Sequence, residues 1–167
     1  MKKFSIPLLP GYHRPVFECY SFTSILDTGA ILPVFSVYAI VLEKVLNAEL
    51  VLKDTTITGF GGEDPGDIYK TRDFKLGNLL FKELEFFVPK TIKLQYPFLF
   101  SATMFYGTAY EVDTIHNLLN VTLEDNDNME RDFKIKDLKG KLYPQINGAL
   151  LQIPDMYFSN VDIISCW

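Results

Sequence analysis

The chain has 167 residues, 48% of them hydrophobic and 22% charged, a balance that favours one folded domain and argues against disorder. Its net charge of −5 lacks the basic excess typical of nucleic-acid-binding proteins. The longest apolar run, residues 30–42, is interrupted by Pro33 and is too short to span a bilayer, so we expect neither a nucleic acid nor a membrane as partner and predict a cytoplasmic location.

Taken in chain order, the elements are mostly short strands. Pro7 and Pro10 first interrupt an apolar start before it reaches the length of a secretion signal. Strands are predicted where β-branched and aromatic residues gather between turn signals: 17–26, 31–35, 50–58, 68–76, 79–88, 96–100, 104–112 and 118–123. One short helix is predicted at 36–48 from the spacing of its apolar residues. This pattern indicates an all-β barrel or sandwich.

Two further segments complete the predicted organisation. The glycine-rich stretch 59–66 predicts a hairpin turn or mobile loop between two strands. The acidic, Asn-rich stretch 124–132 is typical of an exposed loop. We therefore predict a domain over residues 1–132, extended by short strands over residues 133–167 that belong to the same domain.

The sharpest chemical feature is the tripeptide Asp27-Thr28-Gly29, which follows the apolar end of a predicted strand. A carboxylate delivered by such a strand is partly desolvated. Thr28 can donate a hydrogen bond to nearby backbone, and Gly29 permits another segment to approach closely because it has no Cβ. An Asp-Thr-Gly tripeptide alone also fits an ordinary turn, so its context decides its meaning.

Two downstream segments supply that context. The glycines Gly59, Gly61 and Gly62 surround Phe60 between two predicted strands, about thirty residues after Asp27. The stretch 96–102 then runs Tyr-Pro-Phe-Leu-Phe-Ser-Ala. With the Tyr-x-x-Asp strand at 110–113 and the strand after it, the chain resembles the retropepsin-like aspartic peptidases, the single-lobe relatives of pepsin, over residues 17–123.

The resemblance implies a role for each of these segments. The fold would be the closed β-barrel of the acid-protease lobe, with one short helix and a flap hairpin. Asp27 would be the catalytic residue, in a loop with Thr28, Gly29 and Ala30. The loop would be supported by the strand that ends at Ser101 and Ala102. Residues 59–62 would form the flap over an extended peptide, with no metal and no organic cofactor.

Two departures from the family pattern bear on these expectations. Ser101 and Ala102 stand where the family has glycine after two apolar residues, and we expect such small residues to preserve the support. Ile31 stands where retroviral enzymes carry a polar residue that binds the substrate backbone, which puts that contact in doubt. The alternative function is therefore a catalytically inactive protein of the same fold that binds peptides or acts as a scaffold.

A homodimer follows from the chemistry of this class. Aspartic peptidases use two carboxylates that share a proton, and the chain contains a single Asp-Thr-Gly. The pairs Asp54-Thr55 and Asp113-Thr114 lack the glycine. The second Asp27 must therefore come from a symmetry-related copy. The expected function is hydrolysis of peptide bonds, with a peptide or protein as substrate, by water activated between the two Asp27 side chains.

Other readings of the polar residues are weaker. His13 and His116 have no partner that the sequence identifies, and Ser101 lies in no nucleophile elbow, so a serine hydrolase is not expected. Pro65 breaks any calcium-loop pattern among the acidic residues near it. Cys19 and Cys166 match no metal-ligand spacing; we favour two free thiols, with a disulfide as the open alternative.

Overall fold

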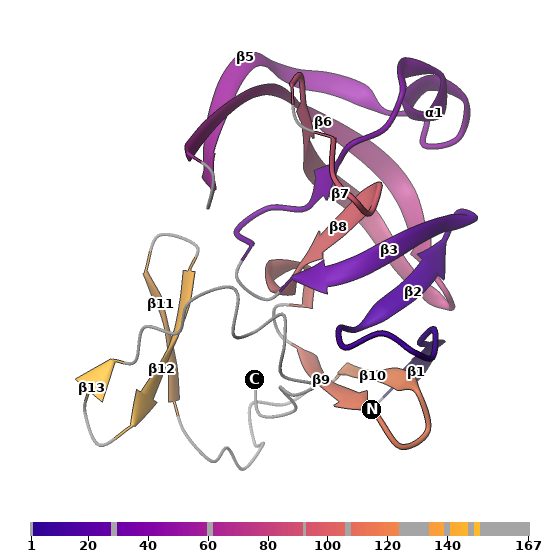
Figure 1. Ribbon diagram of the computed structural model, residues 1–167, viewed down its shortest axis with the longest axis vertical. Helices are drawn as coiled ribbons and strands as arrows, with labels where there is room; N and C mark the ends of the chain where they lie inside the picture. Colours follow the sequence, from indigo (N-terminus) through magenta and orange to yellow (C-terminus); the bar gives the residue numbers. More distant parts are fainter. Residues whose placement is uncertain are drawn as a thin grey trace.

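The computed structural model describes residues 2–27, 30–59, 62–91, 93–105, 108–123, 134–138, 141–146 and 149–150. Within this part the chain is mainly β-sheet with one short α-helix, α1 (Ala39–Lys44), and one 3₁₀ turn, η1 (Ala102–Phe105) (Figure 1). The predicted all-β class is confirmed. No helix of the described residues is long and apolar enough to cross a membrane.

The largest sheet has seven strands and contains Asp27 and Ser101, two residues of the predicted site. In spatial order these are β2 (Val16–Cys19), β3 (Phe22–Asp27), β8 (Phe98–Ser101), β4 (Val34–Phe35), β7 (Leu79–Pro89), β6 (Gly62–Leu76) and β5 (Glu49–Gly59). Strands β3 and β8 run parallel, whereas β5, β6 and β7 form a long antiparallel meander. Figure 1 shows this meander curving across the upper part of the molecule, beside α1.

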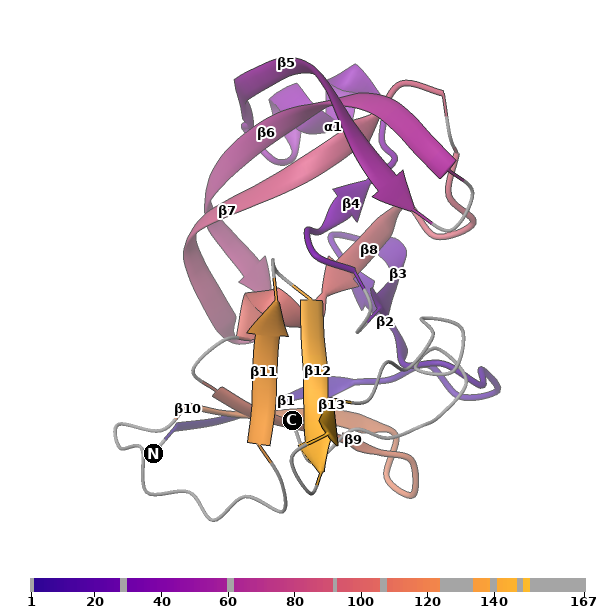
Figure 2. The same cartoon turned by 90° about the vertical axis from the view of Figure 1, so that its left-hand side faces the viewer.

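Two smaller sheets complete the described structure. One joins the N-terminal strand β1 (Lys2–Pro7) to β10 (Leu118–Leu123), which pairs in turn with β9 (Thr108–Asp113). The other contains β11 (Lys134–Leu138), β12 (Lys141–Ile146) and β13 (Ala149–Leu150) (Figure 2). The predicted strands of the C-terminal extension are thus present, while residues 151–167, including Cys166, lie outside the described residues.

The predicted closure into a barrel is corrected by the strand pairing. Among the described residues, the terminal strands of the large sheet, β2 and β5, do not pair with each other. The pairing of β5 with β6 shifts register twice between Leu50 and Thr55, and Asp54 has a positive φ of 55°. Such irregularities interrupt the regular row of backbone groups that a closing strand would need.

The strand predicted at 17–26 is in fact the hairpin of β2 and β3. Tyr20 and Ser21 at its tip have positive φ angles of 49° and 65°. Two successive left-handed residues form the tight turn that best matches the twist of paired strands. Neither residue is the glycine or asparagine that normally signals such a turn, which is why the sequence pattern missed it.

Two other predicted elements are shorter than expected. The helix predicted at 36–48 is limited to α1, because Tyr38 supplies no side-chain cap at its start and Asn47 beyond its end has a positive φ of 47°. The strand predicted at 31–35 is limited to β4, since Pro33 before it has no backbone N–H to donate.

The broad turn predicted at 59–66 is also narrower than expected. Strand β6 begins at Gly62, which pairs with Gly59, so residues 63–66 are strand residues. Gly66 lies so close to Phe87 and Val88 of β7 that a Cβ at this position would overlap both. The glycine therefore serves close packing of two strands, not chain reversal.

Aromatic side chains form the centre of the core. Phe35, Phe74, Phe86, Phe98 and Phe100 are all almost fully buried. The ring of Phe35 lies 4.4 Å from that of Phe86 and 4.5 Å from that of Phe98, measured between centroids. The interpretation of the Phe-rich segments as core is confirmed. Strand β8 itself contributes Phe98 and Phe100 to this core.

Candidate active site

Asp27 is the last residue of β3, a strand whose preceding residues Ile25 and Leu26 are buried. The strand pairs with β2 on one side and, in parallel, with β8 on the other. In that register Asp27 lies opposite Ser101, the last residue of β8. The half-buried Asp27 therefore emerges from the core at the point where two neighbouring strands end together.

The chain turns immediately after Asp27. The backbone N–H of Ala30 donates to the carbonyl of Asp27 at 3.3 Å, which closes a four-residue turn. Thr28 and Gly29, predicted to belong to the catalytic loop, lie outside the described residues. The turn brings the chain back beside the end of β8.

Side-chain hydroxyls from the end of β8 hold the backbone beyond this turn. The fully buried Ser101 donates from its Oγ to the carbonyl of Ala30. Thr103, in η1, donates from its Oγ1 to the carbonyl of Ile31 at 2.9 Å. The structure thus brings together three residues predicted to belong to one site, Asp27, Ala30 and Ser101.

Thr103 was missed by the sequence reasoning, because it lies between the predicted strands 96–100 and 104–112. In the structure it belongs to η1, which also includes the first two residues of the second predicted strand. Its backbone N–H donates to Ser101 Oγ at 3.2 Å, a local side-chain-to-backbone bond that favours a turn over an extended strand. A Ser-x-Thr spacing directly after an apolar strand was the available signal. The side chain of Ala102, between the two hydroxyl residues, lies outside the described part.

The predicted flap corresponds to the hairpin of β5 and β6. Gly59 and Gly62 pair at its closed end, and Gly62 has a positive φ of 112° that favours glycine. Phe60 and Gly61 lie outside the described residues. In Figure 1 the end of β5 and the start of β6 lie at the upper left of the molecule, and the arrow of β3 points to the left below them.

An ionic cluster holds the hairpin to Lys90, the residue that directly follows β7. Lys90 contacts Asp54 of β5 and lies 3.3 Å from Asp67 of β6. Asp67 also accepts the backbone N–H of Asp54 at 2.8 Å. The hydrogen bond from Lys90 lowers the pKa of Asp54, and the same bond raises the pKa of Lys90. Asp54 and Lys90 are exposed and Asp67 is half-buried, so their pairing fixes geometry more than it adds stability.

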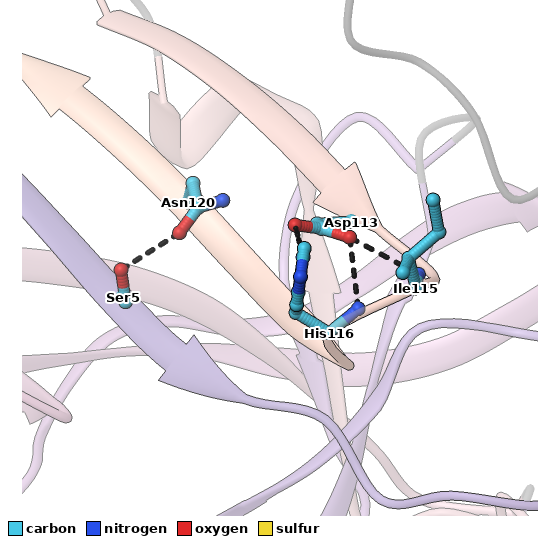
Figure 3. A network of polar contacts seen from close by, with 5 residues as sticks. All are labelled: Ser5, Asp113, Ile115, His116 and Asn120. Carbon is cyan, nitrogen blue, oxygen red and sulfur yellow. Dashed lines mark hydrogen bonds and ion pairs between the residues drawn. The ribbon is translucent and has the colours of Figure 1, made fainter.

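Asp113 ends β9 and is also followed by threonine, but its carboxylate has a different environment. It accepts the backbone N–H groups of Ile115 at 3.0 Å and His116 at 2.9 Å, while its second oxygen lies 2.7 Å from His116 Nδ1 (Figure 3). The backbone hydrogen bond from His116 is the main cause that lowers the pKa of Asp113. This carboxylate caps its own turn, and His116, expected to lack a partner, has one here.

Figure 3 also shows Ser5 of β1 donating to Asn120 of β10 at 2.7 Å, a bond that links the two strands. Cys19 is a buried free thiol, and its burial raises the pKa of the thiol to about 12. It is thus a core residue and a poor nucleophile. In the described part of the chain no three His, Cys, Asp or Glu side chains gather as metal ligands would.

No protein-family model matches this chain, and no curated protein matches it either. The candidate site therefore stands on its own residues and contacts, of which the junction of β3, β8 and the turn after Asp27 is the most closely built.

Proposed function

We propose that this chain is the subunit of a homodimeric aspartic endopeptidase with an acid-protease-type lobe. The observation that carries the proposal is the position of Asp27. It ends a buried strand, lies opposite Ser101 on a parallel neighbour, and begins a turn whose next carbonyls accept hydroxyl groups from β8 and η1. A carboxylate presented by a fixed backbone beside the core is the arrangement that acid–base catalysis requires.

The chemistry needs two such carboxylates. Two carboxyl groups about 3 Å apart cannot both ionise, so they hold one proton in common. The ionised member takes a proton from the attacking water, and the protonated member donates a hydrogen bond to the scissile carbonyl. Since the chain has one Asp-Thr-Gly, the second carboxylate comes from Asp27 of another copy across a two-fold axis.

The hairpin of β5 and β6 supplies the lid in this proposal. A hairpin with glycines at its tip can close over an extended peptide and offer backbone hydrogen bonds to it. The ion pairs of Asp54 and Asp67 with Lys90, which directly follows β7, hold the base of the hairpin in place. No metal and no organic cofactor take part in the reaction.

A non-catalytic peptide-binding function is the second candidate. It is favoured by Ile31, which is 45% exposed and stands where retroviral enzymes carry a polar residue that binds the substrate backbone. An exposed apolar side chain at this position can bind apolar residues of a peptide whether or not the peptide is then cut. The two functions differ in whether the peptide is cut.

The test is incubation of the purified protein with a peptide library between about pH 3 and pH 7. The proposal predicts cleavage with a bell-shaped dependence on pH, because one carboxyl group must be ionised and one protonated. A statine-type mimic of the tetrahedral intermediate should inhibit cleavage. Tight peptide binding without cleavage at any pH would instead support the non-catalytic function.

A further inference from the structure

The two hydroxyl groups beneath the Asp27 turn contact each other as well as the backbone. Ser101 Oγ and Thr103 Oγ1 are 2.7 Å apart, a hydrogen-bonding distance in which either oxygen can be the donor. Together with the bonds to the carbonyls of Ala30 and Ile31, they form a continuous chain of four oxygens. The chain connects the end of β8 with two successive residues after the turn.

The number of hydroxyl protons limits how many of these oxygen–oxygen contacts can be hydrogen bonds at one time. Three oxygen–oxygen contacts are present, but each hydroxyl has a single proton, so at most two of the contacts are hydrogen bonds at one time. If both protons serve the two carbonyls, the hydroxyl oxygens face each other without a proton between them. The backbone N–H of Thr103, which donates to Ser101 Oγ at 3.2 Å, supplies further positive charge at this point.

The support of the turn therefore depends on both side chains. If Thr103 loses its hydroxyl, the carbonyl of Ile31 loses the hydrogen bond from Thr103. Ser101 then keeps its hydrogen bond to the carbonyl of Ala30 but loses its contact with the Thr103 hydroxyl. The turn itself is closed by one backbone bond of 3.3 Å, a long hydrogen bond. Its geometry consequently depends on the carbonyls that follow it.

We propose that Thr103 is a positioning residue, which acts with Ser101 as a hydroxyl pair that fixes the backbone after Asp27 and thereby the direction of the Asp27 carboxyl group. This inference rests on the proposed peptidase function for its kinetic consequence. Thr103 acts through the backbone of residues 30 and 31, whose carbonyls the two hydroxyl groups bind.

The experiment compares Thr103→Val with a matched variant elsewhere. Valine keeps the shape of threonine and removes its hydroxyl. Thr71 offers the control, because its hydroxyl also donates to a backbone carbonyl, that of Leu46, and this bond is remote in sequence from the turn after Asp27. Both Thr103→Val and Thr71→Val lose one hydroxyl-to-carbonyl bond, so a general loss of stability appears in both.

Three outcomes are expected if Thr103 positions Asp27. Thr103→Val lowers kcat roughly tenfold to a hundredfold with KM changed less than about twofold, because a small misplacement of a catalytic group affects the reaction more than binding. Thr103→Ser restores kcat. Thr71→Val leaves kcat of the folded protein at the wild-type value. Equal kcat in Thr103→Val and wild type, or equal losses in Thr103→Val and Thr71→Val, would overturn the proposal.

A second measurement separates this inference from the proposed function. Amide hydrogen exchange of peptides that cover residues 27–35 should be faster in Thr103→Val and unchanged in Thr71→Val, whether or not the protein cleaves peptides. Unchanged exchange over this segment would refute the positioning role. If exchange rises while the wild type cleaves no peptide, the positioning inference holds and the peptidase proposal fails.

Discussion

The turns after Asp27 and Asp113 follow similar sequences, but different groups form the hydrogen bonds that hold them. Each follows a strand of six residues, and in each the aspartate is followed by threonine. At Asp113 the carboxylate itself accepts the backbone N–H groups of Ile115 and His116. At Asp27 the carbonyls that follow the turn accept hydroxyl groups from Ser101 and Thr103, more than seventy positions away in sequence.

The difference shows that the same dipeptide at the end of a strand can be followed by turns that are held by different groups. The Asp113 carboxylate is the cap that holds its own turn, so its hydrogen bonds are part of the fold. In the Asp27 turn the carbonyls of residues 30 and 31 are bound by distant hydroxyls. Residues from the end of β8 and from η1 thus bind the backbone there.

The largest expected effect comes from removing each carboxylate in turn. Asp27→Asn should lower cleavage at least about a thousandfold, because the amide can neither share the proton nor act as general base. Asp113→Asn should leave cleavage near the wild-type rate, since asparagine also accepts backbone N–H groups in such a turn. Cleavage rates measured on each purified variant check this. Comparable losses in both variants would remove the distinction between the two turns.

An effect of intermediate size is expected on stability when a buried leucine near each turn is replaced. Leu26 and Leu119 are both almost fully buried, the first beside Asp27 and the second in the strand that pairs with β9. Replacement of either by alanine should lower the free energy of unfolding by about 2–5 kcal/mol. Leu26→Ala should in addition lower kcat of the folded protein, and Leu119→Ala should not. Denaturant unfolding combined with kinetics measures both quantities, and identical kinetics in the two variants would contradict the expectation.

The smallest expected effect is on how the stability that the Asp113 turn contributes depends on pH. The hydrogen bond from the His116 backbone holds the pKa of Asp113 below its usual 3.8. A lowered pKa in the folded state means that this stabilisation is complete above pH 3.8 and is lost as the pH falls through the lowered value. The melting temperature of Asp113→Asn should therefore approach that of the wild type as the solution becomes more acidic. A gap that widens in acid would show that the sign is wrong.

Sequence reasoning found the residues that the structure brings together at Asp27, but not what connects them. Asp27 could be chosen because a turn tripeptide follows an apolar strand, whereas Ala30 and Ser101 were assigned to the same site through the resemblance to the retropepsin-like peptidases. The bond from Thr103 to Ile31 depends on the parallel register of β3 and β8, which no local pattern specifies.

The errors in the predicted elements have the same origin. Left-handed Tyr20 and Ser21 make a turn without a turn residue, and Gly66 is required by the approach of Phe87 and not by a reversal of the chain. The N-terminal strand β1 was not predicted, because its pairing partner, β10, lies more than a hundred residues later. In each case a tertiary contact decides what the local sequence leaves open.

The central claim is that one active site needs two Asp27 side chains, and mixing subunits tests it most directly. Wild-type and Asp27→Asn chains are combined in varied proportions at constant total concentration and allowed to exchange partners. If both carboxylates are required, cleavage falls as the square of the wild-type fraction, to about a quarter in an equal mixture. A fall in simple proportion to that fraction, to about half, would mean that each Asp27 works alone and would contradict the account.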